Sequence, residues 1–85
     1  MAVRLLYFAW VRERTGISSE MVELPAGLET VADVMGWLTT RGPHFASAFE
    51  RRDVIRTAVN QTHVPHATNL AGAKEIAFFP PVTGG

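Results

Sequence analysis

The sequence predicts an α+β fold in which a mixed β-sheet packs on one main helix, and three observations lead to this prediction. The chain of 85 residues is short enough for one domain, and its 47% hydrophobic content is sufficient for a packed core. Short segments rich in β-forming residues occur near both ends of the chain. One strongly amphipathic segment lies between them. We therefore expect all elements to share a single core.

The N-terminal region predicts two strands that pair as a hairpin. Residues 3–10 are rich in β-forming side chains and form the first expected strand. Alternate positions place three side chains on its core face: Val3, Leu5 and Tyr7. Phe8 falls on the opposite face. Residues 11–16 suggest a short helical turn or a loop, and residues 19–24 alternate weakly, as expected for a second strand.

Residues 28–42 contain the clearest helix signal. Thr30 is a favourable N-cap, and Asp33 three residues later can complete a capping box. An apolar stripe at helical spacing follows: Val31, Val34, Met35 and Leu38. Gly42 is expected in the left-handed conformation that ends many helices, and Pro43 prevents continuation.

The C-terminal half predicts a second, shorter helix and three further strands. The helix is expected over residues 44–52, and the third strand over residues 54–59. A turn at residues 60–61 leads to a short strand over residues 62–64, and the last strand covers residues 74–79. This order of elements favours a β-grasp, ubiquitin-like arrangement.

Two aromatic residues form a candidate recognition surface. In a β-grasp sheet the first and last strands are neighbours. Phe79 lies on the face of the last strand opposite Ile76 and Phe78, and Phe8 has the matching position on the first strand. We expect the two rings to form one exposed apolar patch, which usually marks a protein interface. The alternative is that both side chains belong to the core.

Charge and cysteine content exclude several classes of function. Eight basic and eight acidic side chains give a net charge of zero, which argues against nucleic acid or an anionic membrane as the main partner. The absence of cysteine excludes disulfides, thiolate metal sites and cysteine nucleophiles, and fits a reducing compartment. No leader pattern occurs, and no apolar run approaches the roughly 20 residues that span a bilayer. We expect a soluble, cytoplasmic protein.

The usual catalytic motifs are missing as well. No glycine-rich phosphate loop and no paired carboxylates occur in the sequence. His63 and His66 are interpreted as loop histidines rather than metal ligands, because Pro65 denies them a shared helical face. We therefore expect no metal site, and no catalysis by this chain alone.

The C-terminal sequence is the strongest functional signal. Pro80 and Pro81 stiffen the chain after the last strand. We expect residues 1–81 to form the domain and residues 82–85 to project from it as a flexible tail. Four residues make up this tail: Val82, Thr83, Gly84 and Gly85. Such a narrow tail can enter a pocket of another protein and present its terminal carboxylate there.

A carboxylate is a poor electrophile, so the tail must be activated by a partner. Adenylation with ATP would convert the Gly85 carboxylate into a mixed anhydride. A sulfur donor would then give a thiocarboxylate, whereas a lysine would give an isopeptide bond. Both outcomes remain open at this point.

Three stretches of the sequence resemble the small, sulfur-carrying subunit of molybdopterin synthase. They are Ala58-Val59-Asn60-Gln61-Thr62, the terminal residues 75–85 and the opening residues 6–13. The resemblance implies a β-grasp fold and no cofactor bound by the chain itself. It also implies that a ubiquitin-activating-like adenylyltransferase uses ATP and Mg to activate Gly85, and that a sulfur donor protein then converts it to thiocarboxylate.

The resemblance further implies a large-subunit partner that receives the tail. Two sulfurs would pass there to cyclic pyranopterin monophosphate, and a dimeric large subunit would give a heterotetramer. The implied partner-binding residues are Phe8, Phe79 and the tail with Pro80 and Pro81. His63 occupies a partner-facing position that is usually apolar in that family. The alternatives are a carrier for thiamine or another pathway, a lysine-conjugating modifier, or an interaction domain whose Gly-Gly ending is incidental.

Overall fold

The computed structural model describes residues 2–81, and these form one mixed sheet of five strands in the order β2-β1-β5-β3-β4. The strands are β1 (Ala2–Tyr7), β2 (Ser19–Glu23), β3 (Arg56–Val59), β4 (Thr62–Val64) and β5 (Glu75–Phe79). The central pair, β1 and β5, is parallel, whereas the other neighbours are antiparallel. The first and last strands are therefore neighbours, as the β-grasp prediction requires.

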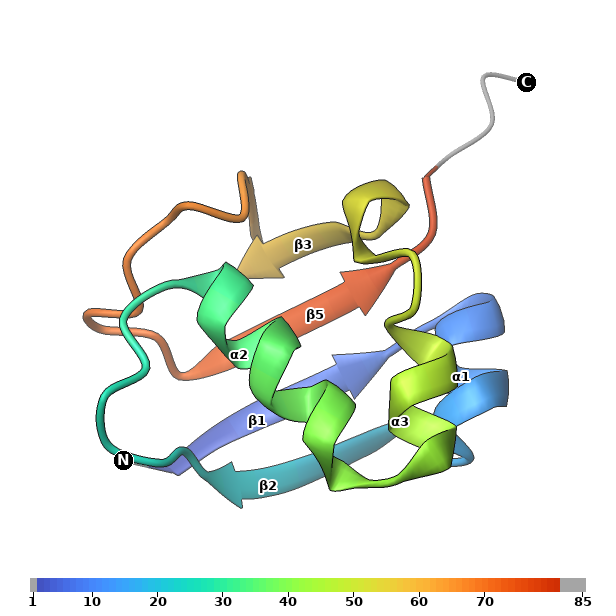
Figure 1. The fold of residues 1–85 in the computed structure, drawn as a ribbon. Helices are drawn as coiled ribbons and strands as arrows, with labels where there is room; N and C mark the ends of the chain where they lie inside the picture. The colour runs from blue at the N-terminus through green and yellow to red at the C-terminus, as the bar shows by residue number, and fades with distance from the viewer. Residues whose placement is uncertain (1, 82–85) are drawn as a thin grey trace.

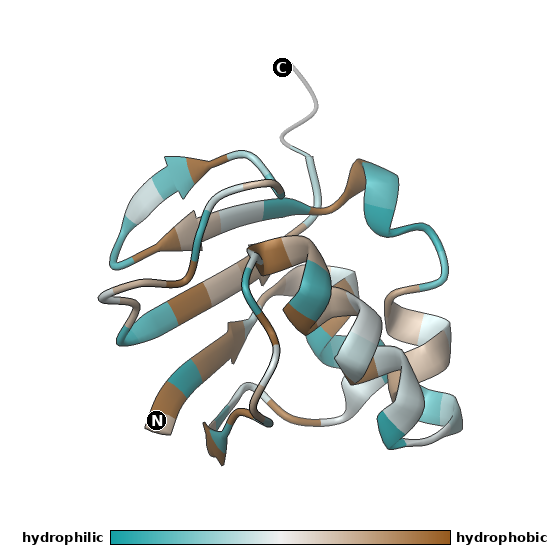
Figure 2. Cartoon of the chain, turned by 60° about the vertical axis from the view of Figure 1, so that its left-hand side comes forward, coloured by the Kyte–Doolittle hydropathy of each residue, from teal (hydrophilic) through white to brown (hydrophobic). Residues whose placement is uncertain are grey.

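Helices cover one face of this sheet (Figure 1). They are α1 (Ala9–Thr15), α2 (Val31–Leu38) and α3 (Pro43–Ala48), with 3-10 turns η1 (Thr39–Arg41) and η2 (Arg52–Val54). The central strands are mostly apolar (Figure 2), and buried positions alternate with exposed or half-buried ones along them, as expected where one face packs on the core. In both views the described helices lie on the same side of the sheet, which leaves the other side without a helical layer.

The capping box at the start of α2 is confirmed. The Thr30 hydroxyl accepts a hydrogen bond from the Asp33 backbone N–H at 3.2 Å, and the Asp33 carboxylate accepts one from the Thr30 N–H at 3.0 Å. Backbone N–H donors from Glu29 and Thr30 lower the pKa of Asp33. The predicted stripe of four residues on α2 is buried in the core. The helix therefore begins and faces the sheet as its sequence predicts.

The end of this helix differs from the prediction. The α-helix ends at Leu38 and tightens into η1, so the expected helix over residues 28–42 is shorter. Gly42 has φ 133° and ψ 172°, which is not the left-handed helical conformation. Pro43 is the first residue of α3, where its missing N–H leaves no helix hydrogen bond unmade. The second helix accordingly covers Pro43–Ala48 instead of residues 44–52.

The first strand is also shorter than predicted, because the chain turns after Phe8. Ala9 has φ 52°, and the Phe8 carbonyl accepts hydrogen bonds from the Val11 and Arg12 N–H groups. Trp10 therefore lies on α1 and not on a strand. The segment predicted as a short helical turn or a loop is the helix α1, which begins at Ala9, two residues earlier than the predicted segment. Its C-cap is Gly16, whose φ of 85° is in the left-handed region.

The turn between β3 and β4 anchors the start of β5. Asn60 and Gln61 have φ 49° and 70°, the conformation that two-residue hairpin turns require. The Asn60 side-chain oxygen accepts hydrogen bonds from the Lys74 and Glu75 N–H groups at 2.9 and 3.1 Å. β5 thus begins at Glu75, whereas η2 delays the start of β3 to Arg56. The Asn-Gln turn fixes where the last strand enters the sheet.

Candidate functional site

The candidate site lies at the edge of the sheet where β1 and β5 both end. These strands are parallel, with Tyr7 opposite Phe78, so the chain leaves β5 beside the end of β1. Pro80 and Pro81 follow the last strand and are half-buried. The predicted tail residues Val82, Thr83, Gly84 and Gly85 lie outside the described residues. The fold therefore directs the chain toward its terminus from this edge.

Phe8 and Phe79 lie on the face of the sheet that carries no helical layer. Their neighbours Tyr7 and Phe78 are 1% and 0% exposed, whereas Phe8 is 47% exposed and Phe79 is half-buried. The backbone N–H of Phe8 donates to the Phe78 carbonyl at 3.1 Å, which joins the two strand ends. The alternative that both rings belong to the core is therefore wrong.

His63 reaches the same face from the far side of the sheet. It lies on β4 opposite Ala58, and its exposed ring contacts Phe79 with 5.1 Å between ring centroids. His66 has a different role, because its Nε2 lies 2.7 Å from the Ile55 carbonyl oxygen. Among residues 2–81, no three histidine, aspartate or glutamate side chains are grouped to hold a metal ion. His63 thus joins the candidate docking surface, and His66 supports the hairpin.

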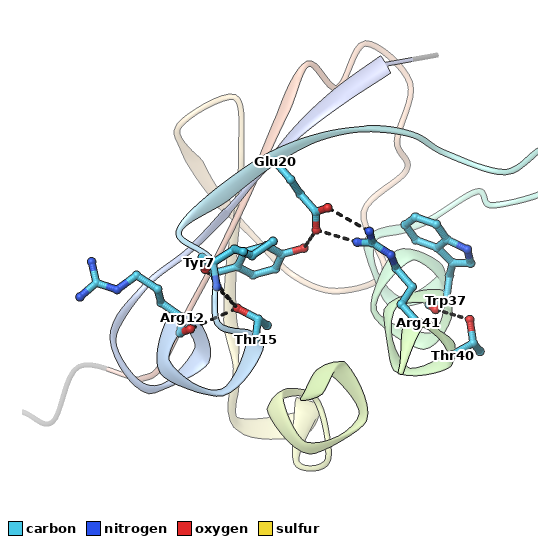
Figure 3. Close-up of polar contacts among 8 residues, drawn as sticks. Tyr7, Arg12, Thr15, Glu20, Trp37, Thr40 and Arg41 are labelled. Atoms are coloured by element: carbon cyan, nitrogen blue, oxygen red, sulfur yellow. Dashed lines mark hydrogen bonds and ion pairs between the residues drawn. The ribbon is translucent and has the colours of Figure 1, made fainter. Parts of the chain in front are cut away.

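A polar network that the sequence analysis missed lies on the helix side of the sheet (Figure 3). The Tyr7 hydroxyl donates to Glu20 Oε2 at 2.7 Å. Arg41 donates from Nη1 and Nη2 to the two Glu20 oxygens at 2.6 and 2.9 Å. Sequence separations of 13 and 21 residues hide these contacts from local pattern analysis. The available signal was Glu20, an acidic residue at an alternating position of the predicted second strand. A charged side chain at such a position indicates a partner elsewhere in the fold.

The network shifts the pKa values of its members. Burial, with the hydrogen bond to Glu20, raises the pKa of Tyr7. Burial alone would raise the pKa of Glu20, but hydrogen bonds from Arg41 and Tyr7 outweigh it and lower that pKa. The hydrogen bonds to Glu20 raise the pKa of Arg41. These shifts favour a protonated Tyr7 and Arg41 and an ionised Glu20, which are the states that the hydrogen bonds require. The cluster therefore holds β1, β2 and η1 together.

Aromatic packing on the helix-covered face holds the ends of β1 and β5. Tyr7 stacks on Phe78 with 5.8 Å between ring centroids, and Phe49 meets Phe78 edge-on at 5.2 Å. The rings of Phe45 and Phe49 also meet Tyr7 edge-on, at 6.0 and 6.3 Å. Because Tyr7 and Phe78 are held by these contacts, the backbone presents Phe8 and Phe79 in a fixed position. The candidate site thus consists of aromatic side chains on the uncovered face, beside the packed ends of β1 and β5.

Comparison with known proteins places these features in context. The sequence profile of the ThiS family matches residues 5–85. The molybdopterin synthase sulfur carrier subunit of Haemophilus influenzae is 36% identical, covering 98% of this chain and 99% of the relative. The subunit of the same description from Escherichia coli is 37% identical with the same coverage. The crystal structure of SAMP1 from Haloferax volcanii superimposes with a TM-score of 0.72 at 26% identity, covering 100% of both chains.

Proposed function

The chain belongs to the ThiS family, and from this membership we propose that it is the sulfur carrier subunit of a molybdopterin synthase. The observation that carries the proposal is similarity along nearly the whole chain to two curated subunits of that description. The structure supports it, because β5 directs the chain toward its Gly-Gly end from an apolar edge. Within residues 2–81, no helix has the length and apolar character needed to cross a membrane. We propose a cytoplasmic location, where ATP is supplied.

The proposed chemistry begins at the Gly85 carboxylate. A ubiquitin-activating-like adenylyltransferase binds ATP and Mg, and the carboxylate oxygen attacks the α-phosphorus while pyrophosphate leaves. A sulfide equivalent from a donor protein then attacks the carbonyl carbon, and AMP leaves as the C–S bond forms. The product is a thiocarboxylate on the chain terminus. With no cysteine in the sequence, no internal thiol of this chain competes for the activated acyl group.

Sulfur delivery takes place in the large subunit. We propose that Phe8, Phe79 and His63 dock on that subunit while Pro80 and Pro81 direct residues 82–84 into its active site. The thiocarboxylate sulfur attacks a carbon of cyclic pyranopterin monophosphate, and a C–O bond at that carbon breaks so that its oxygen leaves and takes up a proton. Water then cleaves the acyl–sulfur bond, which leaves the sulfur on the substrate and restores the Gly85 carboxylate. Two such deliveries supply the two sulfurs of the product. The chain itself binds no cofactor in this scheme.

Deletion of Gly85 tests the proposal. We expect the variant to keep the fold, because the core cluster is built from residues within the domain, and to lose sulfur transfer completely in a reconstituted reaction. The measurement is formation of molybdopterin from cyclic pyranopterin monophosphate with the large subunit, activating enzyme, ATP, Mg and a sulfur source. Equal activity of the deletion variant and the wild type would refute the proposed role of the terminus.

A second function has specific structural support. Solved relatives at 26% identity include proteins described as small archaeal modifier protein 1, a name that indicates attachment to other proteins. A modifier of this kind would form an isopeptide bond from Gly85 to a lysine. Affinity purification of a tagged chain from its own cells distinguishes the two. Covalent protein conjugates support modification, and recovery of a molybdopterin synthase large subunit supports sulfur delivery. Recovery of a thiamine-pathway partner would support a carrier for thiamine.

A further inference from the structure

Part of the exposed apolar surface of residues 2–81 lies outside the docking surface proposed above. Among the described residues, three large hydrophobic side chains are exposed: Phe8 at 47%, Ile17 at 37% and Met21 at 60%. Phe8 belongs to the docking surface proposed above. Ile17 and Met21 do not, and neither the fold nor the sulfur chemistry explains their exposure. Clustered apolar exposure of this kind marks an interaction surface.

Strand register places Met21 on the same face as Phe8, and Ile17 precedes the first residue of β2 by two positions. Met21 on β2 lies opposite Arg4 on β1, and Ser19 lies opposite Leu6. The Tyr7 N–H donates to the Ser18 carbonyl at 2.9 Å, so the pairing continues beyond β2 toward Ile17 and Phe8. Side chains alternate along a strand, which puts odd-numbered positions of this segment on the side away from the core.

Apolar side chains on the uncovered face lead from the last strand toward β2. Leu6 on β1 lies opposite Ala77 on β5, and both are half-buried on the face without helices. Phe79 follows two residues later on the same face of β5. The apolar run therefore extends from β5 to Leu6 on β1. Met21 on β2 lies diagonal to Leu6 on the same face, and the direct cross-strand partners there are Arg4 and Ser19. The apolar positions on β1 and β5 are continuous with the docking surface at the chain exit.

The position of β2 in the sheet is a further reason to expect that a partner covers the exposed Met21 side chain. β2 is an edge strand of the sheet, and its outer neighbour position is vacant within residues 2–81. An apolar side chain exposed on an edge strand promotes unwanted association unless a partner covers it. The charged groups Arg4 and Glu75 face each other across β1 and β5 toward the opposite end of the strands. Arg4 is also the direct cross-strand partner of Met21, so these charged groups border the apolar positions on the β2 side, as the polar rim does in many protein interfaces.

We propose that the docking face extends onto β2, and that Ile17 and Met21 contact an apolar surface of the large subunit that receives the tail. This inference rests on the proposed function. The occupant follows from continuity, because a protein that takes the chain end must lie over the edge formed by Phe8 and Pro80. A second copy of this chain bound symmetrically to the same face would cover that edge.

Methyl NMR tests the inference without altering the protein. Protein labelled with ¹³C at methionine methyl groups is titrated with the large subunit, and the Met21 signal is assigned from a Met21→Leu variant. We expect the Met21 signal to shift or broaden at saturation, whereas the signal of Met35, which is 0% exposed, stays close to its free position. A Met21 signal unchanged in a saturated complex overturns the inference and leaves the proposed function intact.

Substitution supplies the energetic measurement. We expect Met21→Glu to weaken large-subunit binding about ten-fold or more, as for burial of a hot-spot residue. Ala32→Glu, on the exposed side of α2, is the matched control and should leave the affinity unchanged. Thermal unfolding of both variants verifies their fold. Equal affinities of the two variants for the large subunit overturn the inference. It is also overturned if the wild type forms a concentration-dependent dimer that Met21→Glu abolishes while the affinity for the large subunit stays the same. A wild type that binds no large subunit refutes the proposed function and this inference together.

Discussion

Adjacent residues on the two central strands have opposite surroundings. Tyr7 and Phe78 point into the helix-covered core and are fully buried, whereas Phe8 and Phe79 point to the uncovered face. The chemistry of the side chains is similar, so the difference arises from the alternation of the strand. One pair stabilises the fold, and the other pair is available to a partner. The comparison shows how strand alternation places aromatic side chains on both the core face and the uncovered face of one small sheet.

Truncation of Phe78 is expected to give the largest loss of stability. Phe78→Ala removes a ring that stacks on Tyr7 and meets Phe49, and the resulting cavity should lower the free energy of unfolding by about 3–5 kcal/mol. Phe79→Ala, one residue away, is expected to lower it by less than about 1 kcal/mol, as for a half-exposed position. Urea denaturation measures both. Similar losses for the two variants would contradict the division between the faces.

For binding to the large subunit we expect Phe79 to matter more than the buried residues of the core. Phe79→Asp places a charge on the docking surface, and we expect the dissociation constant for the large subunit to rise about 30-fold or more. Isothermal titration calorimetry gives the affinity, and circular dichroism verifies the fold. Lys74→Gln is the control, because it lowers the net charge by one, as Phe79→Asp does. Lys74 precedes β5 at the end of the strand opposite Phe79. The proposal fails if the two variants bind equally well.

The Tyr7–Glu20–Arg41 network predicts a dependence of stability on pH. Glu20→Gln should lower the free energy of unfolding at neutral pH by about 1–3 kcal/mol, as for a hydrogen-bonded charge. The pKa of Glu20 is lowered in the fold, so its contribution is present above its ordinary value of 4.5 and is lost as pH falls through the lowered value. The stability difference between wild type and variant should therefore shrink in acid. A constant difference from neutral pH to acid would contradict this assignment.

The smallest effect concerns the start of α2. Thr30→Ala removes the hydroxyl that accepts from the Asp33 N–H, and we expect a loss of about 1 kcal/mol in unfolding free energy. Partner affinity should be unchanged, because the capping box lies on the helix that covers the core face. Thermal denaturation detects the first effect and calorimetric titration tests the second. A weakened complex would show that the helix layer also takes part in docking.

Local patterns predicted much of the fold and part of the site. The apolar stripe of α2, the Asn60–Gln61 turn and the face of Phe79 all follow from the spacing of neighbouring residues. The turn into α1 did not, because it depends on Ala9 adopting a positive φ that its side chain does not favour. The pairing of Glu20 with Arg41 depends on the tertiary fold. The exposed Met21 could have been found by extending the hairpin register, because it lies on the face of the second strand opposite the core. Ile17 precedes that strand, so its exposure depends on the connection from α1.

The most direct test of the account is the chemical state of Gly85. Intact-mass spectrometry of the protein isolated with its activating enzyme, ATP, Mg and a sulfur source should show a population shifted by one oxygen-to-sulfur exchange. Fragmentation should locate that shift at the terminal glycine. A protein that carries only the unmodified carboxylate under these conditions would contradict the sulfur-carrier proposal.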